Sequence, residues 1–317
     1  TLGRRVDHAR RPLAMYALLE MGIAITAAAV SILLGGMETV YLALTERLGL
    51  SGGLLSATQF GLATAVMLPP TLLMGATLPV VARAFAVREG ELGRTVGHLY
   101  ALNTLGAVSG TAAAGFALLP TLGARHSLAV AVTANVAAGV VALITDRWCR
   151  SVGADPRPGP AREIGNATGA GTGLASKGVA RLALGAIAVS GAAAMVYEIA
   201  WTRALSLVVG SSVYAFSAML TTFLLGLAAG SALYAWLAGR RTGQVQARLL
   251  GWLQAAVAVT ALALAPAFQW LPDLVLALAR WTGVSAHGAF LAQFGLSALV
   301  MLPPAMLLGA AFPCAVA

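Results

Sequence analysis

The sequence predicts an all-α integral membrane protein, a polytopic bundle of about eight transmembrane helices. Three observations predict this fold class: 59% of the 317 residues are apolar, only 10% are charged, and one stretch occurs twice. Ordinary globular chains carry roughly 25% charged residues, so water cannot be the main solvent of this protein. A helix needs about 20 apolar residues to cross a bilayer. The candidate spans lie near residues 13–35, 56–84, 94–120, 125–146, 182–208, 212–238, 246–270 and 288–316.

The repeated stretch is QFGLATAVMLPPTLLMGATLP at 59–79, and its second copy is QFGLSALVMLPPAMLLGAAFP at 293–313. An ungapped alignment at an offset of 234 positions gives identity at 13 of 21 positions, which indicates a tandem duplication. The helix order predicts six helices in a complete repeat. Both repeats are expected to be incomplete, because the first copy lacks its opening helices and the second lacks its closing helices.

The predicted domain organisation follows this duplication. Residues 1–146 form the first membrane repeat, and residues 180–317 form the second. Between them, residues 147–179 are rich in Gly, Pro, Ala and Arg, which is typical of a flexible linker.

Each copy of the repeated stretch places a proline pair and a glycine inside a long helix. A proline pair removes two backbone donors, so a kink or a break is expected near the middle of the membrane. The glycine that follows permits close approach by a neighbouring helix, which can satisfy the freed carbonyls. The residues expected to kink or pack the helices are Pro69, Pro70, Gly75, Pro303, Pro304 and Gly309. A similar packing role is expected for the small residues of span 94–120, including Gly106, Gly110 and Gly115.

The net charge of +9 is explained by orientation and gives no indication of a nucleic-acid partner. Sixteen of the 20 Lys and Arg residues lie in the alternate loops that include the N-terminal segment, and four lie on the other side. This distribution follows the positive-inside rule and predicts that both chain ends are cytoplasmic.

The most informative polar residue inside a span is Glu198, with Tyr197 and Trp201 beside it. An unpaired charge in the bilayer costs at least a few kcal/mol. The functional interpretation is therefore a cation or proton site. The alternative is an ion pair or hydrogen bond that fixes the packing of the helix.

Two further polar residues are candidates for substrate contacts. Glu20 aligns with the neutral Gln254 in the repeat, so a carboxylate is present in one half only and could couple to a cation. The alternative is that Glu20 lies near the interface and stays hydrated. Asn103 belongs to a polar patch with Tyr100, for which interhelical hydrogen bonding is the simpler role.

No catalytic arrangement, metal-ligand spacing or cofactor motif is evident. The four histidines are scattered, and the two cysteines lie at different predicted depths. We therefore expect no catalytic residue, metal or cofactor within this chain.

Four stretches, at 67–84, 99–123, 190–216 and 223–236, resemble the membrane region of bacterial membrane-bound spermidine-synthase-like proteins. They include MLPPTLLMGATLPVVARA, SGAAAMVYEIAWTRALSLVVGSSVYAF and FLLGLAAGSALYAW. That family is described as a major-facilitator-like membrane part that is often fused to an aminopropyltransferase domain. The resemblance implies a major-facilitator-like bundle of two six-helix repeats in the bacterial inner membrane. Its substrate would be a small cation of the polyamine type.

The leading hypothesis is a membrane module that handles or presents such a polyamine-like substrate. Glu198, Glu20, Tyr197, Trp201 and Asn103 are the candidate contacts. An alternative from another class is a structural or accessory subunit of a larger membrane assembly, whose partners are the lipid bilayer and other membrane subunits. A third is the membrane part of a fused aminopropyltransferase. The chain has no alternating strand–helix region, so spermidine synthase activity would require a soluble domain outside it.

Overall fold

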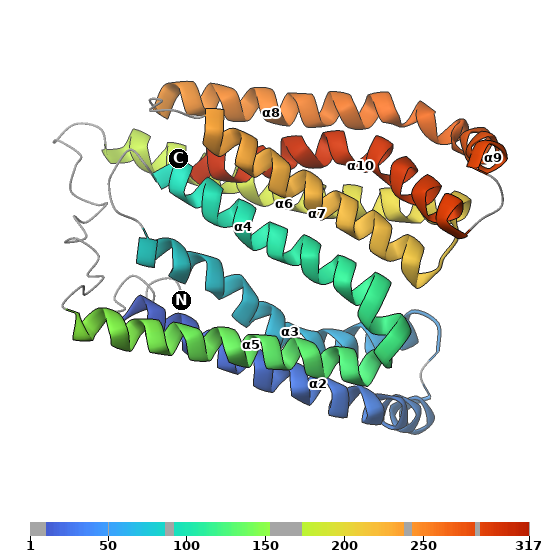
Figure 1. Cartoon of the computed structure of the whole chain (residues 1–317), viewed down its shortest axis with the longest axis horizontal. Helices are drawn as coiled ribbons and strands as arrows, with labels where there is room; N and C mark the ends of the chain where they lie inside the picture. The colour runs from blue at the N-terminus through green and yellow to red at the C-terminus, as the bar shows by residue number, and fades with distance from the viewer. Residues whose placement is uncertain are drawn as a thin grey trace. The chain divides into compact units, whose positions relative to one another are not determined.

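The computed structural model describes residues 11–49, 51–85, 92–152, 173–237, 243–282 and 286–316. The structure is 96% helical, and these ranges contain no strand, which confirms the prediction of an all-α protein. The elements, labelled in Figure 1, are α2 (Pro12–Leu48), α3 (Gly53–Phe85), α4 (Leu92–Ala113), η1 (Ala114–Leu118), α5 (Leu119–Ser151), α6 (Gly173–Val209), α7 (Val213–Leu237), α8 (Gly243–Leu264), η2 (Pro266–Gln269), α9 (Leu271–Thr282) and α10 (Ala286–Val316).

Five helical segments in the described ranges are long and apolar enough to cross a membrane. They are Pro12–Leu33, Gly53–Ala82, Val96–Ser151, Val213–Leu237 and Phe294–Ala315. Several apolar helices of this length are consistent with a lipid bilayer environment and suggest a membrane protein. In α8 the apolar part, Arg248–Leu264, is shorter than the other segments.

The longest segment, Val96–Ser151, covers two of the spans expected from the sequence. Its 56 residues far exceed the length that one crossing needs. Gly123 interrupts the helical geometry with φ 71° and ψ 175°, a conformation that favours glycine. α2 also differs from expectation, because it continues beyond residue 35 to Leu48 and ends at Gly49, a left-handed cap with φ 58°.

The chain divides into two compact units, which we describe separately. Unit 1 comprises Thr1–Phe85 and Thr121–Pro158, and unit 2 comprises Ala86–Pro120 and Gly159–Ala317. The boundaries 1–146, 147–179 and 180–317 follow the sequence repeat rather than this packing, and they stay a prediction. The central part of the expected linker lies outside the described residues, and its two ends continue α5 to Ser151 and begin α6 at Gly173.

Two helix pairs, α2–α3 in unit 1 and α8–α10 in unit 2, pack through equivalent residues. The α2–α3 contact consists of Met15, Tyr16, Leu19, Leu73, Ala76 and Val80. A shift of 234 positions brings five of these six onto residues of one cluster in unit 2, namely Leu249, Leu250, Leu253, Ala310 and Cys314. The repeated sequence therefore builds the same helix–helix contact twice.

Both proline-containing helices run without a break in their helical assignment. α3 continues across Pro69 and Pro70, and α10 continues across Pro303 and Pro304. In each pair the first proline is exposed and the second is buried. The pairs therefore lie within continuous helices, each with one ring turned toward the protein.

Within unit 2, α7 and α10 approach until their backbones touch. A side chain on Gly230 would collide with the backbone of Met306, and one on Gly309 would collide with the backbone of Leu227. The buried hydroxyl of Ser231 donates a 2.7 Å hydrogen bond to the carbonyl oxygen of Gly309. Small residues that let backbones approach, together with an interhelical hydrogen bond, are typical of packing between membrane helices.

Among the described residues, only some of the glycines of α4 and η1 pack against a neighbouring helix. A Cβ on Gly97 would lie 3.1 Å from the Cβ of Ala235, and one on Gly115 would collide with Ser217. Gly106 and Gly110, in contrast, are exposed, and nothing lies within 4 Å of the position of an added Cβ. The described residues therefore place no neighbouring helix against Gly106 and Gly110, and the expected packing role of these two glycines stays a prediction.

Candidate functional site

The five residues predicted to contact substrate fall in both units. Tyr197, Glu198 and Trp201 lie on α6 and Asn103 lies on α4, all in unit 2. Glu20 lies on α2 in unit 1. The three residues of α6 therefore form one cluster, and the other two candidates have different surroundings.

The two aromatic residues of α6 belong to the packed interior of unit 2. The rings of Tyr197 and Trp201 stack with centroids 5.1 Å apart and an interplanar angle of 11°. Trp201 is only 4% exposed and forms part of the main apolar cluster with Leu205 and Met219. This placement gives Trp201 a packing role and anchors the turn of α6 that carries Glu198.

Glu198 is half-buried on the same turn of α6. Among the described residues, it makes no ion pair and no hydrogen bond. The alternative interpretation requires an ion-pair or hydrogen-bond partner for this carboxylate, and the described residues provide none.

Glu20 has a different environment, because it is enclosed by its own unit. The residue is 8% exposed, and its carboxylate lies near the hydroxyl of Tyr16, one turn earlier on α2. A Cβ on Gly139 of α5 would lie 3.4 Å from the Cβ of Glu20. The expected alternative, a hydrated side chain near the interface, does not match this burial.

Asn103 is exposed on α4, whereas its neighbour Thr104 is buried. The hydroxyl of Thr104 donates a 2.7 Å hydrogen bond to the carbonyl oxygen of Tyr100. Tyr100, rather than Asn103, is the residue of this polar patch that faces the cavity described next.

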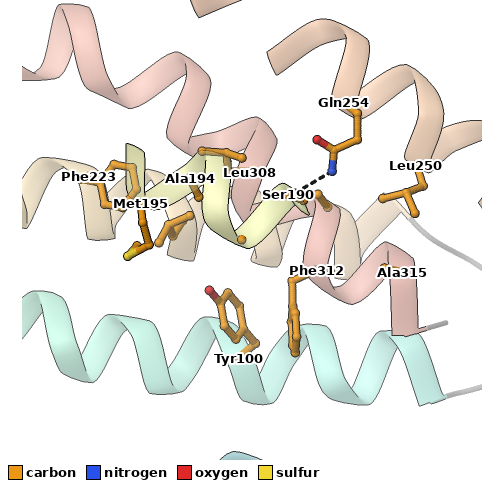
Figure 2. A pocket seen from close by; sticks show the side chains of 13 residues that line it. Tyr100, Ser190, Ala194, Met195, Phe223, Leu250, Gln254, Leu308, Phe312 and Ala315 are labelled. Carbon is orange, nitrogen blue, oxygen red and sulfur yellow. Dashed lines mark hydrogen bonds between the residues drawn. The ribbon is translucent and has the colours of Figure 1, made fainter. Parts of the chain in front are cut away.

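A cavity of about 210 Å³ lies inside unit 2, where α4, α6, α7, α8 and α10 meet (Figure 2). Its lining is mainly apolar, and its polar side chains are those of Tyr100, Ser190 and Gln254. The amide of Gln254 on α8 donates a 2.7 Å hydrogen bond to the hydroxyl of Ser190 on α6. Tyr100 and Phe312 lie side by side in Figure 2, with ring centroids 4.8 Å apart.

Glu198 does not line this cavity, but it lies on the same side of α6 as residues that do. Gly191, Ala194 and Met195 line the cavity, and Glu198 follows them by seven, four and three positions. In an α-helix these spacings place side chains on one face. The carboxylate is thus about one helical turn beyond the cavity.

The sequence analysis did not identify Ser190 or the cavity. The sequence signal that was available is the repeat, because Gln254 and Leu250 line the cavity at the positions equivalent to Glu20 and Tyr16. In unit 1 these two positions bring a tyrosine hydroxyl close to a carboxylate, and in unit 2 they border the cavity. The duplication has therefore given equivalent residues different surroundings.

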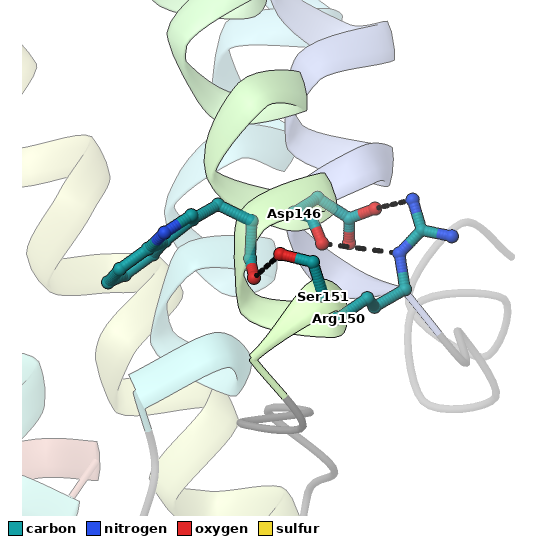
Figure 3. A network of polar contacts seen from close by, with 4 residues as sticks. Asp146, Arg150 and Ser151 are labelled. Carbon is teal, nitrogen blue, oxygen red and sulfur yellow. Dashed lines mark hydrogen bonds and ion pairs between the residues drawn. The ribbon is translucent and has the colours of Figure 1, made fainter.

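Outside this region, one ion pair joins Asp146 and Arg150 near the end of α5 in unit 1 (Figure 3). The guanidinium lies 2.9 Å from the carboxylate, and the hydroxyl of Ser151 donates to the carbonyl oxygen of Trp148 at 2.8 Å. These contacts fasten the last turn of α5. The described ranges contain no group of three or more His, Cys, Asp or Glu side chains that could hold a metal ion.

No protein-family model, no curated protein and no solved structure matches this chain.

Proposed function

We propose that the chain is a membrane module that handles or presents a small cationic, polyamine-like substrate, and that Glu198 is its cation contact. The observation that carries the proposal is a half-buried carboxylate on an apolar helix with no ion-pair or hydrogen-bond partner among the described residues. An uncompensated charge within a membrane helix is costly, and intramembrane carboxylates commonly mark ion or substrate pathways.

The volume and the lining of the cavity favour a substrate that is small and partly apolar. Its volume of about 210 Å³ is below the roughly 300–1,000 Å³ of sites for drug-sized ligands. An alkyl di- or triamine combines methylene segments, which suit the apolar lining, with amino groups that can donate hydrogen bonds. Tyr100 and Gln254 offer oxygen acceptors inside the cavity, and Glu198 lies one turn further along α6.

The finer architecture is part of the same proposal. We infer about eight transmembrane helices from two incomplete six-helix repeats of major-facilitator-like arrangement. The identity at 13 of 21 repeated positions and the equivalent packing of α2–α3 and α8–α10 support this arrangement. The location in a bacterial inner membrane with cytoplasmic chain ends is supported by the family resemblance and by the distribution of Lys and Arg.

Binding of a labelled polyamine to the purified protein in nanodiscs tests the function. We expect the wild-type protein to bind spermidine and the Glu198→Gln variant to lose at least about tenfold in affinity, because the counter-charge is removed. Glu38→Gln is the matched control, since Glu38 is an exposed carboxylate of α2. Equal spermidine affinity in the two variants would contradict the assignment of Glu198.

A second candidate is a structural or accessory subunit of a larger membrane assembly. The exposed face of α3, described in the next subsection, favours it. In that case the purified protein would bind no polyamine but would be isolated from gently solubilised native membranes together with other membrane subunits.

The third candidate is the membrane part of a fused aminopropyltransferase, which is supported by the sequence resemblance alone. The intact mass of the protein isolated from its native membrane tests it. A mass far above 32.1 kDa, with peptides from a synthase-like domain, is the result expected of a fused enzyme.

A further inference from the structure

α3 and α10 are copies of one sequence, yet equivalent residues on one face differ sharply in burial. Met67 is 42% exposed, whereas its equivalent Met301 is fully buried. Met74 is 51% exposed, whereas its equivalent Leu308 is 6% exposed. The same contrast holds for two small residues: Thr71 and Gly75 are exposed, and their equivalents Ala305 and Gly309 are buried.

These residues form one continuous face of α3. Thr71 follows Met67 by four positions, and Met74 and Gly75 follow Thr71 by three and four, spacings that place these residues along one side of a helix. Contact with α2 does not account for this face, because α3 packs on α2 through Leu73, Ala76 and Val80. We call Met67, Thr71, Met74 and Gly75 the open face of α3.

The equivalent face of α10 is covered by α7. A side chain on Gly226 of α7 would collide with Ala305, and one on Gly309 of α10 would collide with the backbone of Leu227. Ser231 closes the contact by donating to the carbonyl oxygen of Gly309. The pattern on α7 is thus two glycines four positions apart, Gly226 and Gly230, followed directly by a serine.

We propose that the open face of α3 is a docking surface for one transmembrane helix that the described residues do not include. This helix carries the pattern of α7: two small residues four positions apart, followed by a serine. The open face retains the features that α7 uses on α10, because Gly75 allows close backbone approach and its carbonyl oxygen can accept the serine hydroxyl. The contact between α2 and α3 already has its equivalent between α8 and α10. A helix on the open face of α3 would likewise be the equivalent of α7 on α10.

Site-specific photo-crosslinking of the full chain in its native membrane tests the proposal. Benzoylphenylalanine in place of Met74 is expected to crosslink to a peptide that contains the small-residue pattern followed by serine. The matched control is the same probe in place of Ala65 on α3. Ala65 is exposed and its α10 equivalent, Leu299, is 59% exposed, so this probe is expected to give lipid adducts alone. Lipid adducts alone at Met74, a crosslink to α7 of the same chain, or a crosslink to a second copy of this chain would overturn the proposal.

A substitution without a probe provides an independent test. We expect Gly75→Leu, placed beside the Met74 probe, to reduce the crosslinked product at least about tenfold, because a large side chain prevents close helix approach. Folding of the chain itself should not suffer, since nothing lies within 4 Å of a Cβ at Gly75. Gly61→Leu is the control, because Gly61 is also open and its equivalent Gly295 is open in α10. Equal crosslinking with both substitutions would overturn the proposal.

Discussion

The hydroxyl of Ser231 on α7 donates a 2.7 Å hydrogen bond to the carbonyl oxygen of Gly309 on α10, and both residues are buried. Ser231 and Gly309 are 78 positions apart in the chain, so the bond joins two separate helices. It accompanies the backbone contacts made at Gly230 and Gly309. Packing and hydrogen bonding, rather than the hydrophobic effect, drive the association of helices inside a bilayer. The α7–α10 contact is therefore the strongest candidate for the stabilising centre of unit 2.

Ser231→Ala is expected to lower the free energy of unfolding by about 0.6–1.7 kcal/mol, the range measured for hydrogen bonds between membrane helices. Denaturation in bicelles monitored by circular dichroism measures this change. Ser109→Ala is the control, because Ser109 is exposed and donates only to Leu105 in its own helix. If both variants unfold at the same denaturant concentration, the interhelical bond contributes nothing measurable.

Gly115→Ala is expected to lower the free energy of unfolding by about 1–3 kcal/mol, because the added methyl would overlap the side chain of Ser217. The second substitution Ser217→Gly should restore most of this loss by removing the overlapping atoms. Gly106→Ala provides the comparison, since a Cβ there meets nothing within 4 Å. Failure of Ser217→Gly to rescue Gly115→Ala would show that the two helices do not pack in this register.

Gln254→Leu is expected to lower the free energy of unfolding by about 1 kcal/mol through loss of the hydrogen bond to Ser190. Gln59→Leu removes the same kind of group from an exposed bond with Tyr41, so its effect should be smaller. Thermal unfolding in detergent compares the two variants. An equal shift of the unfolding temperature in both variants would mean that the Gln254 bond contributes no more to stability than the exposed Gln59 bond.

Tyr16→Phe and Glu20→Gln are expected to be coupled in a double-mutant cycle, because the tyrosine hydroxyl lies close to the buried carboxylate. Residues in contact commonly show coupling energies of about 0.5–3 kcal/mol, so the coupling should be measurable. Strictly additive effects on unfolding would rule out this contact. The cycle also separates a packing role of Glu20 from substrate binding, because spermidine affinity should not change if Glu20 acts only within unit 1.

The fold class could be predicted from composition, and the repeat placed Glu20 of α2 and Gln254 of α8 at equivalent positions. Span boundaries were harder to predict, because apolar composition does not reveal where a helix ends. α2 continues to Leu48 through residues that are not all apolar, and the left-handed Gly49 ends it. Likewise, Gly110 and Gly115 are both small, yet only Gly115 is buried. Which side of a helix faces a neighbour depends on contacts that composition does not encode.

The candidate site was only partly predictable for a similar reason. Glu198 could be identified because a carboxylate is unusual within an apolar span, and this signal is local. The cavity combines residues of five helices, and the bond between Ser190 and Gln254 joins positions 64 apart. Neutral polar side chains such as these are common in membrane helices, so composition alone did not mark them, although the repeat aligned Gln254 with Glu20.

The direct backbone contact of α7 and α10 also limits how unit 2 can move. At Gly230 and Gly309 no side chain separates the two helices, so no change of rotamer can absorb a displacement of one against the other. Sliding would also break the bond from Ser231. Any conformational change of unit 2 must therefore carry α7 and α10 as one rigid body. The adjustable elements are then α6 and α8, which border the cavity and are joined there by the side-chain bond between Ser190 and Gln254.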